Sequence, residues 1–319
     1  MHYLGFDVAK KKVDGVLMSK AFQIKERFCI TNEVSALSTL ILKLKKDYPH
    51  LTIGAESTGI CHLPVLHACE ELNLDCTILN PLLTKQILQS SIRKRKTDID
   101  DSVRIAKLLM QNEGRVMTYQ EATDKSKVLV RSALKLGEMN QALRLHIKHV
   151  EAILDQVPEP LLKEEASMKE NLKTLKKEAI KSVPKESRKL LESIPGVGAW
   201  LASTMLAEIG DIKRFDSGDA LIAYAGLDPQ IKQSGANLNT HGKITKRGSK
   251  HLRRALTCAA GIAKMHDPEL KKYYTDKRSE GRKYREVLCI LGRKVGFRVF
   301  AVLKRCTPYE KRETKEEQK

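Results

Sequence analysis

Four acidic residues have the types and the spacing that suit work on phosphate groups. Asp7 and Glu56 each come at the end of a short apolar stretch, and Asp98 and Asp101 open an expected helix. Residues three apart share a helix face, so Asp98 and Asp101 would point the same way. Carboxylate oxygens gathered in this way bind Mg²⁺ (or Mn²⁺), and such ions stabilise the attacking and leaving oxygens of a phosphodiester displacement.

The stretch RKRKTDIDDS, residues 93–102, also has a purely structural interpretation. Thr97 is a suitable N-cap, Asp100 stands where a capping-box acid would, and acids in a first turn suit the helix dipole. Asp100 competes with Asp101 for a metal-binding role, but the face shared with Asp98 favours Asp101. In the metal-binding interpretation, four preceding cations would hold nucleic acid: Arg93, Lys94, Arg95 and Lys96.

Positive charge is concentrated toward the C-terminus. The 319 residues carry a net charge of +19, from 58 Lys and Arg against 39 Asp and Glu. Residues 243–305 alone hold 19 basic and 5 acidic residues, a surplus of 14. Such a local surplus indicates phosphate partners rather than a solubilising surface. The expected nucleic-acid contacts are Lys243, Lys246, Arg247, Lys250, Arg253 and Arg254.

Two further motifs each have two interpretations. Gly196 and Gly198, in IPGVG before an apolar stretch, suit either a helix-hairpin-helix whose backbone approaches a phosphate or a plain helix connection. Ser234 lies in the polar stretch 233–242, where a serine is ordinarily a turn former. From the residues alone, nothing nearby marks Ser234 as a nucleophile.

The elements that would position the acids follow from the apolar pattern. Short strands at 3–6, 13–18 and 23–30 form a meander, and strands at 51–57 and 75–80 are separated by helices. This order indicates a mixed sheet with helices on its faces. In one arrangement the first strand lies beside strand 51–57, and all four acids converge at the C-terminal edge of the sheet.

A different period begins at Leu129. Apolar residues step by alternating fours and threes up to Val157, with Asn140 at a seam position, which predicts a coiled coil. Residues 161–179 resume the spacing, so the two arms would either fold back as a hairpin or pair with another chain. Asn140 favours pairing with a like residue in a homodimer, and an intrachain helical linker remains the alternative.

The sequence also bounds where the protein works. Stretches of about twenty apolar residues are absent, and the N-terminus becomes charged too early for a signal peptide. The seven cysteines are irregularly spaced, which fits reduced thiols better than disulfides or a zinc site. We expect a soluble, cytoplasmic, nucleoid-associated protein.

Several of these motifs, in this order, resemble those of one family. GFDVAK, AESTG and KTDIDDS look like the D, E and D-x-x-D motifs of the DEDD insertion-sequence transposases, whose N-terminal domain is similar to RuvC resolvases and RNase H. SIPGVGAWLASTMLAEIGDIKRF and YAGLDP…QSG…GKITKRGSKHLRRAL look like their C-terminal transposase domain. The departures are AESTG where EATG is commoner and Ser102 where alanine is usual.

The resemblance implies both a fold and a domain division. The fold class would be α/β plus α: an RNase H/RuvC-like mixed sheet with flanking helices, a coiled-coil linker and a mostly helical C-terminal domain with a helix-hairpin-helix. The expected parts are a RuvC-like DEDD metal-binding domain at 1–118, the linker at 119–184, the transposase domain at 185–306 and a charged tail at 307–319.

The resemblance also implies an activity. Family members are recombinases similar to site-specific DNA invertases, and several use a noncoding RNA encoded by the element to bridge donor and target DNA. Asp7, Glu56, Asp98 and Asp101 would bind Mg²⁺, and Ser234 would be the nucleophile that forms a phosphoserine link to DNA. The RuvC-like domain of one subunit would lie beside the serine domain of another, in a dimer or a tetramer of two dimers.

Three alternatives remain at this point. A RuvC-like junction nuclease would need the acids and water but not Ser234. Actin-like ATPases and sugar kinases open with a similar strand, Asp and basic turn, but the Gly-rich phosphate loops they need are absent from the first 120 residues. A nucleic-acid-binding protein with a decayed catalytic centre is the third alternative, and the presence of all four acids and the serine argues against it.

Overall fold

The computed structural model describes residues 1–90, 98–230 and 243–310, and the side chains of residues 86–100 are outside the description. Two compact units make up the chain, Met1–Thr123 and Asp124–Lys319. The cations at 93–96 and the predicted nucleophile Ser234 lie outside the described residues. None of the helices in the described ranges is long and apolar enough to cross a bilayer.

The first unit is built on one sheet with the strand order β3-β2-β1-β4-β5-β6. The first three strands pair antiparallel, β4 and β5 continue the sheet parallel to β1, and β6 closes it antiparallel. The strands are β1 (His2–Val8), β2 (Lys12–Ser19), β3 (Ile24–Thr31), β4 (Leu51–Glu56), β5 (Cys76–Leu79) and β6 (Arg115–Val116). This is the predicted mixed sheet, with β6 as an addition that the sequence pattern does not indicate.

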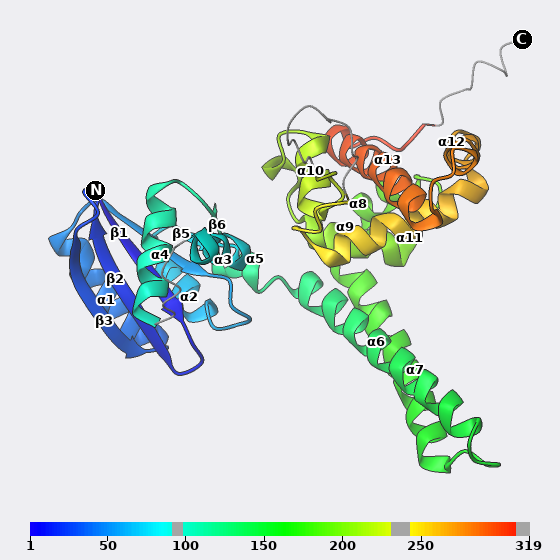
Figure 1. The fold of residues 1–319 in the computed structure, drawn as a ribbon, viewed down its shortest axis with the longest axis horizontal. Helices are drawn as coiled ribbons and strands as arrows, with labels where there is room; N and C mark the ends of the chain where they lie inside the picture. The colour runs from blue at the N-terminus through cyan, green and yellow to red at the C-terminus, as the bar shows by residue number, and fades with distance from the viewer. Residues whose placement is uncertain (91–97, 231–242, 311–319) are drawn as a thin grey trace, which may run out of the picture. The chain divides into compact units, whose positions relative to one another are not determined.

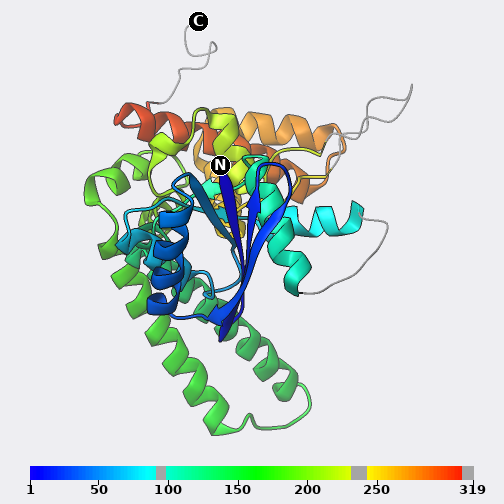
Figure 2. The same cartoon turned by 90° about the vertical axis from the view of Figure 1, so that its left-hand side faces the viewer.

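Helices cover both faces of this sheet, because its central strands are apolar on both sides. Leu4 and Phe6 of β1 pack with α1 and α2, whereas Tyr3 of the same strand packs with α4 on the opposite face (Figure 2). The helices are α1 (Val34–Asp47), α2 (Leu63–Glu71), α3 (Pro81–Ser90), α4 (Asp98–Met110) and α5 (Tyr119–Ala122). The strand order and these layers confirm the RNase H/RuvC-like α/β class.

The second unit begins with a long helical hairpin. Helices α6 (Lys125–Glu151) and α7 (Glu159–Ser182) pack against each other within the chain (Figure 1). The predicted seam extended to Val157, but α6 ends at Glu151 because the chain reverses before Pro158, the N-cap of α7. Of the two predicted pairings, the structure therefore contains the intrachain one.

Asn140 lies in the interior of this hairpin. It is only 8% exposed, and within the described part of the chain its Oδ1 has no hydrogen-bond partner. One turn earlier, Gly137 brings the Leu172 methyl groups close to α6. Asn140 is therefore a buried polar group that the hairpin leaves unsatisfied. Its pairing with a like residue in a homodimer stays a prediction.

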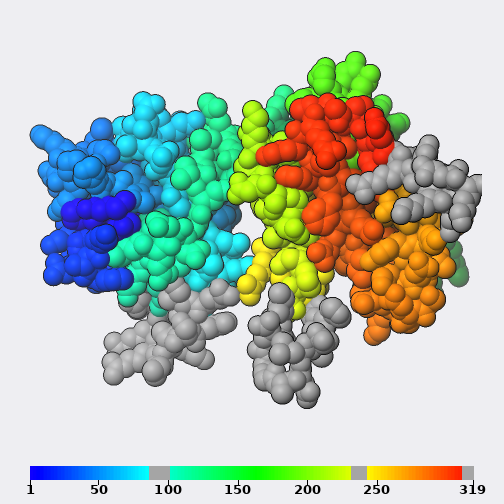
Figure 3. Space-filling view, turned by 90° about the horizontal axis from the view of Figure 1, so that it is seen from above, coloured from blue at the N-terminus to red at the C-terminus, as the bar shows by residue number. Residues whose placement is uncertain are grey.

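The rest of the second unit is a helical globule, as predicted. Its elements are α8 (Lys185–Glu192), α9 (Ala199–Ile209), the short 3-10 helix η1 (Ile212–Arg214), α10 (Gly218–Ala225), α11 (Lys250–His266), α12 (Pro268–Ser279) and α13 (Tyr284–Arg305). The helix α13 enters the core through residues four apart, Val287, Leu291, Val295 and Val299, all fully buried. Its other side and α12 form part of the surface (Figure 3). All seven cysteines of the chain are free thiols.

The division into two units bears on the predicted domains. The helix α5 belongs to the first unit, and the hairpin α6–α7 belongs with the helical globule rather than standing as a separate body. The four-part division into 1–118, 119–184, 185–306 and 307–319 stays a prediction, and the observed boundary is between Thr123 and Asp124.

Candidate functional site

Asp7 and Glu56 lie at the same edge of the sheet and face α4. The strands β1 and β4 run parallel with Phe6 opposite Ala55, so the next positions place Asp7 beside Glu56. Side chains alternate along a strand. Because Phe6 and Ala55 belong to the core beneath α1 and α2, Asp7 and Glu56 project from the other face, which α4 covers.

Two threonine hydroxyls fix the Glu56 carboxylate. Thr84 Oγ1, in α3, donates to Glu56 Oε2 at 2.6 Å, and Thr58 Oγ1 lies 3.3 Å from Oε1. Thr84 is 9% exposed, so its hydrogen bond is shielded from water. Sequence reasoning does not identify Thr84, because a threonine in the first turn of a helix that begins at Pro81 carries no sign of its distant partner.

The helix α4 reaches this face because β1 carries a glycine at position 5. A Cβ on Gly5 would come within 2.6 Å of the Ser102 carbonyl oxygen and 2.6 Å of the Ala106 amide nitrogen. The backbone of α4 therefore rests directly on β1, two residues before Asp7. Ser102 is 1% exposed, so a small side chain is needed there, and serine meets that need as alanine would.

The other two predicted acids, Asp98 and Asp101, belong to α4, the helix that covers this face of the sheet. Asp101 directly precedes Ser102, the residue that contacts β1, and forms an ion pair with Arg104 of the same helix. Asp98 begins α4, but its side chain, like the predicted Thr97 cap and Asp100, is outside the description. Among the residues whose side chains are described, which leave out Asp98, no three His, Cys, Asp or Glu are grouped to hold a metal.

The two glycines of IPGVG have different surroundings. Gly196 adopts φ +85°, and a Cβ there would collide with the Ala259 carbonyl oxygen and come within 2.6 Å of the Ala263 nitrogen, both in α11. Gly198 is the exposed N-cap of α9, and a Cβ on it would meet nothing within 4 Å. Gly196 therefore serves helix packing, and Gly198 is the position whose backbone is open to a phosphate.

Backbone hydrogen bonds pair the residues on the two sides of the segment that carries Ser234. The Gln230 amide donates to the Lys243 carbonyl at 2.9 Å, and the Thr245 amide donates to the Asp228 carbonyl at 2.9 Å. Further from the segment, the Ser249 amide donates to the Tyr224 carbonyl at 2.7 Å. The described structure thus fixes both ends of the segment 231–242.

The predicted nucleic-acid cations of this region divide into two groups. Arg253 Nη1 donates to the Ala225 carbonyl at 2.9 Å and so closes the end of α10, and Arg254 lies 3.6 Å from Glu138 of α6. Arg254 is exposed, and so are the remaining four cations, which lie next to the ends of the Ser234 segment: Lys243, Lys246, Arg247 and Lys250. Arg253 is thus the cation of this set that serves the fold, and the exposed ones are open to phosphate groups.

A buried carboxylate ties this region together, and sequence reasoning misses it. Glu208, at the end of α9, is 1% exposed and accepts hydrogen bonds from Arg131 Nε at 2.7 Å and Arg131 Nη2 at 3.0 Å. It also accepts from the hydroxyl of Ser249, the N-cap of α11, at 2.8 Å. One side chain therefore links α6, α9 and the start of α11. The only signal in the sequence is a lone acid in the apolar stretch AWLASTMLAEI.

Opposing effects set the charge state of Glu208. Burial acts to raise the pKa of its carboxyl, but the hydrogen bonds and positive charge of Arg131 outweigh burial, with help from Ser249 and Lys127. The pKa is lowered as a result, so Glu208 is ionised at neutral pH and the pair with Arg131 is a true ion pair.

Solved structures of RuvC from Thermus thermophilus, one of them in complex with a Holliday junction substrate, align with this chain at 11% identity. The alignments cover 37% of this chain and 99% and 100% of those chains, with TM-scores of 0.29 and 0.31.

Relatives of this chain include proteins that invert or move DNA. The pilin gene-inverting protein of Moraxella bovis is 25% identical over 97% of this chain and 98% of its own length. An insertion element IS110 protein of Streptomyces coelicolor is 36% identical over 39% of this chain, which spans only 30% of that relative. The transposase for insertion sequence element IS1111A of Coxiella burnetii is 38% identical over 32% of this chain and 27% of its own length.

Two family models match successive parts of the chain. A DEDD transposase model of the IS110 type matches residues 4–157, which include Asp7, Glu56, Asp98 and Asp101. The model of the transposase IS116/IS110/IS902 family matches residues 188–275, which include both ends of the Ser234 segment. This chain therefore belongs to the DEDD insertion-sequence transposases of the IS110 family, which are DNA-recombining enzymes.

Proposed function

We propose that this chain cleaves and rejoins DNA through a phosphoserine intermediate at Ser234, assisted by Mg²⁺ at the acidic site and guided by an RNA encoded by the element. The observation that carries the proposal is the pairing of Asp7 and Glu56 on neighbouring strand ends, facing a helix that begins with Asp98. The likeness of the QSG stretch to the family motif supports the role of Ser234, and the exposed cations beside its segment support contacts with phosphate.

The residues at the sheet edge suit Mg²⁺ or Mn²⁺. Every candidate donor is a carboxylate oxygen, which these hard cations prefer, and Thr84 holds the Glu56 carboxylate in one orientation. Asp7, Glu56, Asp98 and Asp101 would hold the ion. When bound, it would supply charge stabilisation for the attacking and leaving oxygens of the phosphodiester.

The serine step conserves phosphate ester bonds. Ser234 Oγ would attack the phosphorus and lose its proton, and one strand end would leave as a free hydroxyl. Rejoining would be the reverse reaction, in which the hydroxyl of another strand attacks the phosphoserine and restores the serine. No external energy source is needed, because one ester replaces another at each step.

The same cations would serve DNA and guide RNA, because both present phosphates. Four exposed cations lie next to the ends of the Ser234 segment: Lys243, Lys246, Arg247 and Lys250. Gly198 offers an open backbone at the start of α9. A dimer, or a tetramer of two dimers, would place the acidic site of one subunit beside Ser234 of another.

A denaturing gel for protein-linked DNA tests the proposal. The protein is incubated with labelled DNA from the element ends, RNA from the flanking noncoding segment and Mg²⁺. We expect an adduct with the unchanged protein and none with Ser234→Ala. The control is Ser167→Ala, which removes an exposed hydroxyl from α7 and should leave the adduct intact. Asp98→Ala should abolish both cleavage and adduct.

Other outcomes would contradict specific parts of the proposal. Cleavage of equal extent in Ser234→Ala, with no adduct in either protein, would indicate a nuclease that uses water. Intact cleavage in Asp98→Ala would show that the carboxylates of α4 act only in the helix cap. Equal adduct formation without RNA would remove the guide from the reaction.

A further inference from the structure

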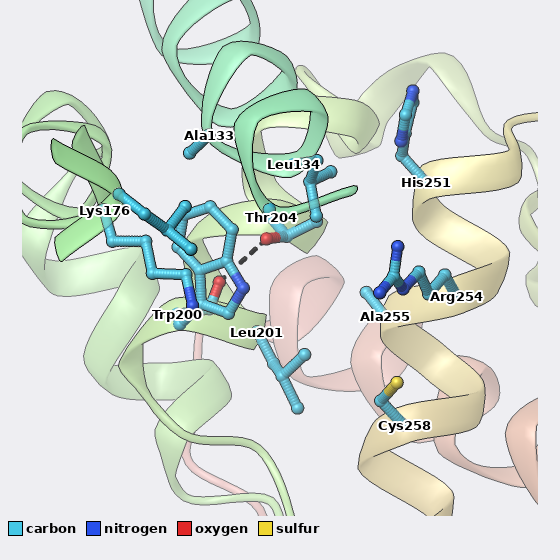
Figure 4. Close-up of a pocket in the computed structure, with 12 residues that line it drawn as sticks. Ala133, Leu134, Lys176, Trp200, Leu201, Thr204, His251, Arg254, Ala255 and Cys258 are labelled. Atoms are coloured by element: carbon cyan, nitrogen blue, oxygen red, sulfur yellow. Dashed lines mark hydrogen bonds between the residues drawn. The ribbon is translucent and has the colours of Figure 1, made fainter. Parts of the chain in front are cut away.

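The second unit contains a pocket whose lining residues have no role in the proposed cleavage and rejoining steps. It lies between the hairpin α6–α7 and the helices α9 and α11, with a volume of about 330 Å³ (Figure 4). Its characteristic lining residues are Leu134, Lys176, Trp200, Leu201, His251 and Arg254. Volumes of this size are typical of sites for small organic groups.

The two walls of the pocket offer an aromatic ring and a planar cation. Trp200 of α9 stands on one wall, with Lys176 Nζ 5.3 Å from its ring centroid. Arg254 and His251 stand on α11 across the pocket from Trp200 (Figure 4). Arg254 lies 3.6 Å from Glu138, an exposed pair that leaves its guanidinium about half accessible. Such surface pairs are weak, so Arg254 is available to a ligand.

Charge and hydrogen bonding narrow the ligand further. None of the twelve described residues that line the pocket is acidic, which disfavours a cationic ligand. The pKa of His251 is lowered, chiefly by burial, so its ring is neutral at pH 7 and offers one donor and one acceptor. A flat, polar-edged group attached to a negative charge fits these surroundings.

We propose that this pocket receives an unstacked nucleobase from a single strand of nucleic acid, held between the Trp200 indole and the Arg254 guanidinium, with a neighbouring phosphate at Lys176. Single-stranded bases stack on aromatic rings and on guanidinium planes, whereas the bases of a duplex are already stacked. The inference rests on the proposed function in assuming a nucleic-acid partner, and it adds where a displaced DNA strand or a guide RNA is held.

The chain provides its own probe for this pocket, because Trp200 is its single tryptophan. The full-length protein is titrated with single strands of about 10 nucleotides, a typical site size, as oligodeoxythymidylate and oligouridylate. A DNA duplex of equal length is the third arm. We expect both single strands to quench Trp200 fluorescence and the duplex to leave it unchanged. A lower Kd for one strand assigns the source as DNA or RNA.

Variants test whether the pocket itself binds the strand. Arg254→Met removes the planar cation but keeps the stem, and Cys258→Phe fills the pocket from an exposed position on α11. Loss of one stacked base should raise the Kd for the single strand about 5- to 100-fold in either variant. The matched control, Lys135→Met, removes an exposed cation of α6 outside the lining and should change Kd no more than about twofold.

Two results would overturn the inference. One is single-strand binding, seen by anisotropy, that leaves Trp200 fluorescence unchanged and is equal in Arg254→Met, Cys258→Phe and Lys135→Met. The other is duplex DNA that quenches Trp200 as strongly as a single strand. Both are independent of the adduct assay, so a failed recombination mechanism and a failed base pocket would be told apart.

Discussion

The sheet edge that carries Asp7 and Glu56 in the first unit and the start of α11 in the second unit are held in place by different interactions. In the first unit, backbone geometry does the work: parallel strands place Asp7 beside Glu56, and Gly5 lets α4 rest on β1. In the second unit, a buried charge positions the elements, because Glu208 joins α6, α9 and the start of α11 through Arg131 and Ser249.

This difference predicts different sensitivities. A site held by backbone packing should fail when a side chain intrudes. A site held by a buried ion pair should fail when its partner charge is lost, and the failure should depend on pH. Trp200 lies in the second unit alone, so its fluorescence separates the unfolding of the two.

The largest effect is expected from Arg131→Met. The Glu208 side chain is fully buried, so losing its partner leaves an uncompensated charge, at a cost of about 3 kcal/mol, the low end of the usual range because the Arg131 side chain is half exposed. Thermal unfolding followed by Trp200 fluorescence measures it. The control is Arg144→Met on the same helix, which breaks a partly exposed pair with Glu165 of α7 at 3.6 Å and should cost under about 1 kcal/mol.

The pH dependence of this variant carries a sign. In the unchanged protein the pKa of Glu208 is lowered, so its carboxylate stabilises the fold above the unfolded pKa and that contribution is lost as pH falls through the folded pKa. Without Arg131, burial dominates and the folded pKa is raised. Relative to the unchanged protein, Arg131→Met should then gain stability from pH 7 to pH 5, while the lowered pKa of the half-buried His251 makes both proteins lose some stability over the same range. A stability difference between the two proteins that does not change with pH would mean that Glu208 is solvated.

A smaller loss is expected from Gly5→Ala. The added Cβ would meet the α4 backbone at 2.6 Å, and overpacking of this kind costs about 1–3 kcal/mol. Far-UV circular dichroism should show an earlier transition while the Trp200 transition stays in place. Gly137→Ala is the matched control, with its nearest neighbour 3.8 Å away, and should stabilise α6 by up to about 1 kcal/mol. A Trp200 transition that shifts in Gly5→Ala would show that the units unfold together.

Asn140→Leu should stabilise the hairpin. The side-chain oxygen of Asn140, Oδ1, is buried without a hydrogen-bond partner in the described chain. Such a group lowers the free energy of unfolding by about 1 kcal/mol or more. Thermal unfolding followed by Trp200 fluorescence and light scattering should show a higher Tm at unchanged mass. A change in mass would show that Asn140 sets the pairing of two chains, which the sequence pattern also allows.

The smallest effect separates contact from support among the cations. Lys246→Ala should reduce the slope of log K against log salt for DNA binding by about 1, with Tm unchanged. Arg253→Ala should lower Tm by the loss of its bond to the Ala225 carbonyl, with a change in slope well below that of Lys246→Ala. Equal slopes and equal Tm in both variants would show that Lys246 and Arg253 do not differ in this way.

The sequence predicts the first unit well for a physical reason. Strand alternation is local, so the ends of β1 and β4 can be read from short stretches, and Asp7 and Glu56 come with them. Local patterns do not reveal partners far along the chain. The charge of the buried Glu208 is balanced by Arg131, 77 residues earlier in the chain, and Thr84 gives no sign in the sequence of its hydrogen bond to Glu56.

The sequence also leaves choices that only tertiary packing makes. A heptad seam is the same whether its partner is α7 or another chain, so the pattern around Asn140 cannot select between them. The glycines of IPGVG look alike in the sequence, but α11 lies against Gly196 and leaves Gly198 open. The role proposed for Ser234 rests on family resemblance, because a serine in a polar stretch is ordinarily a turn former and gives no local sign of a nucleophile.

The ion pair of Arg131 has a mechanical consequence. Helix α6 has 27 residues, about 40 Å at about 1.5 Å per residue, and Arg131 lies within its first two turns. The hairpin is therefore a lever with its pivot near one end. A modest pull at the far end, near Glu151, becomes a large torque on Glu208 and on the cap of α11. A partner bound at the tip of the hairpin would exert force on Glu208 and on Ser249 without contacting either residue.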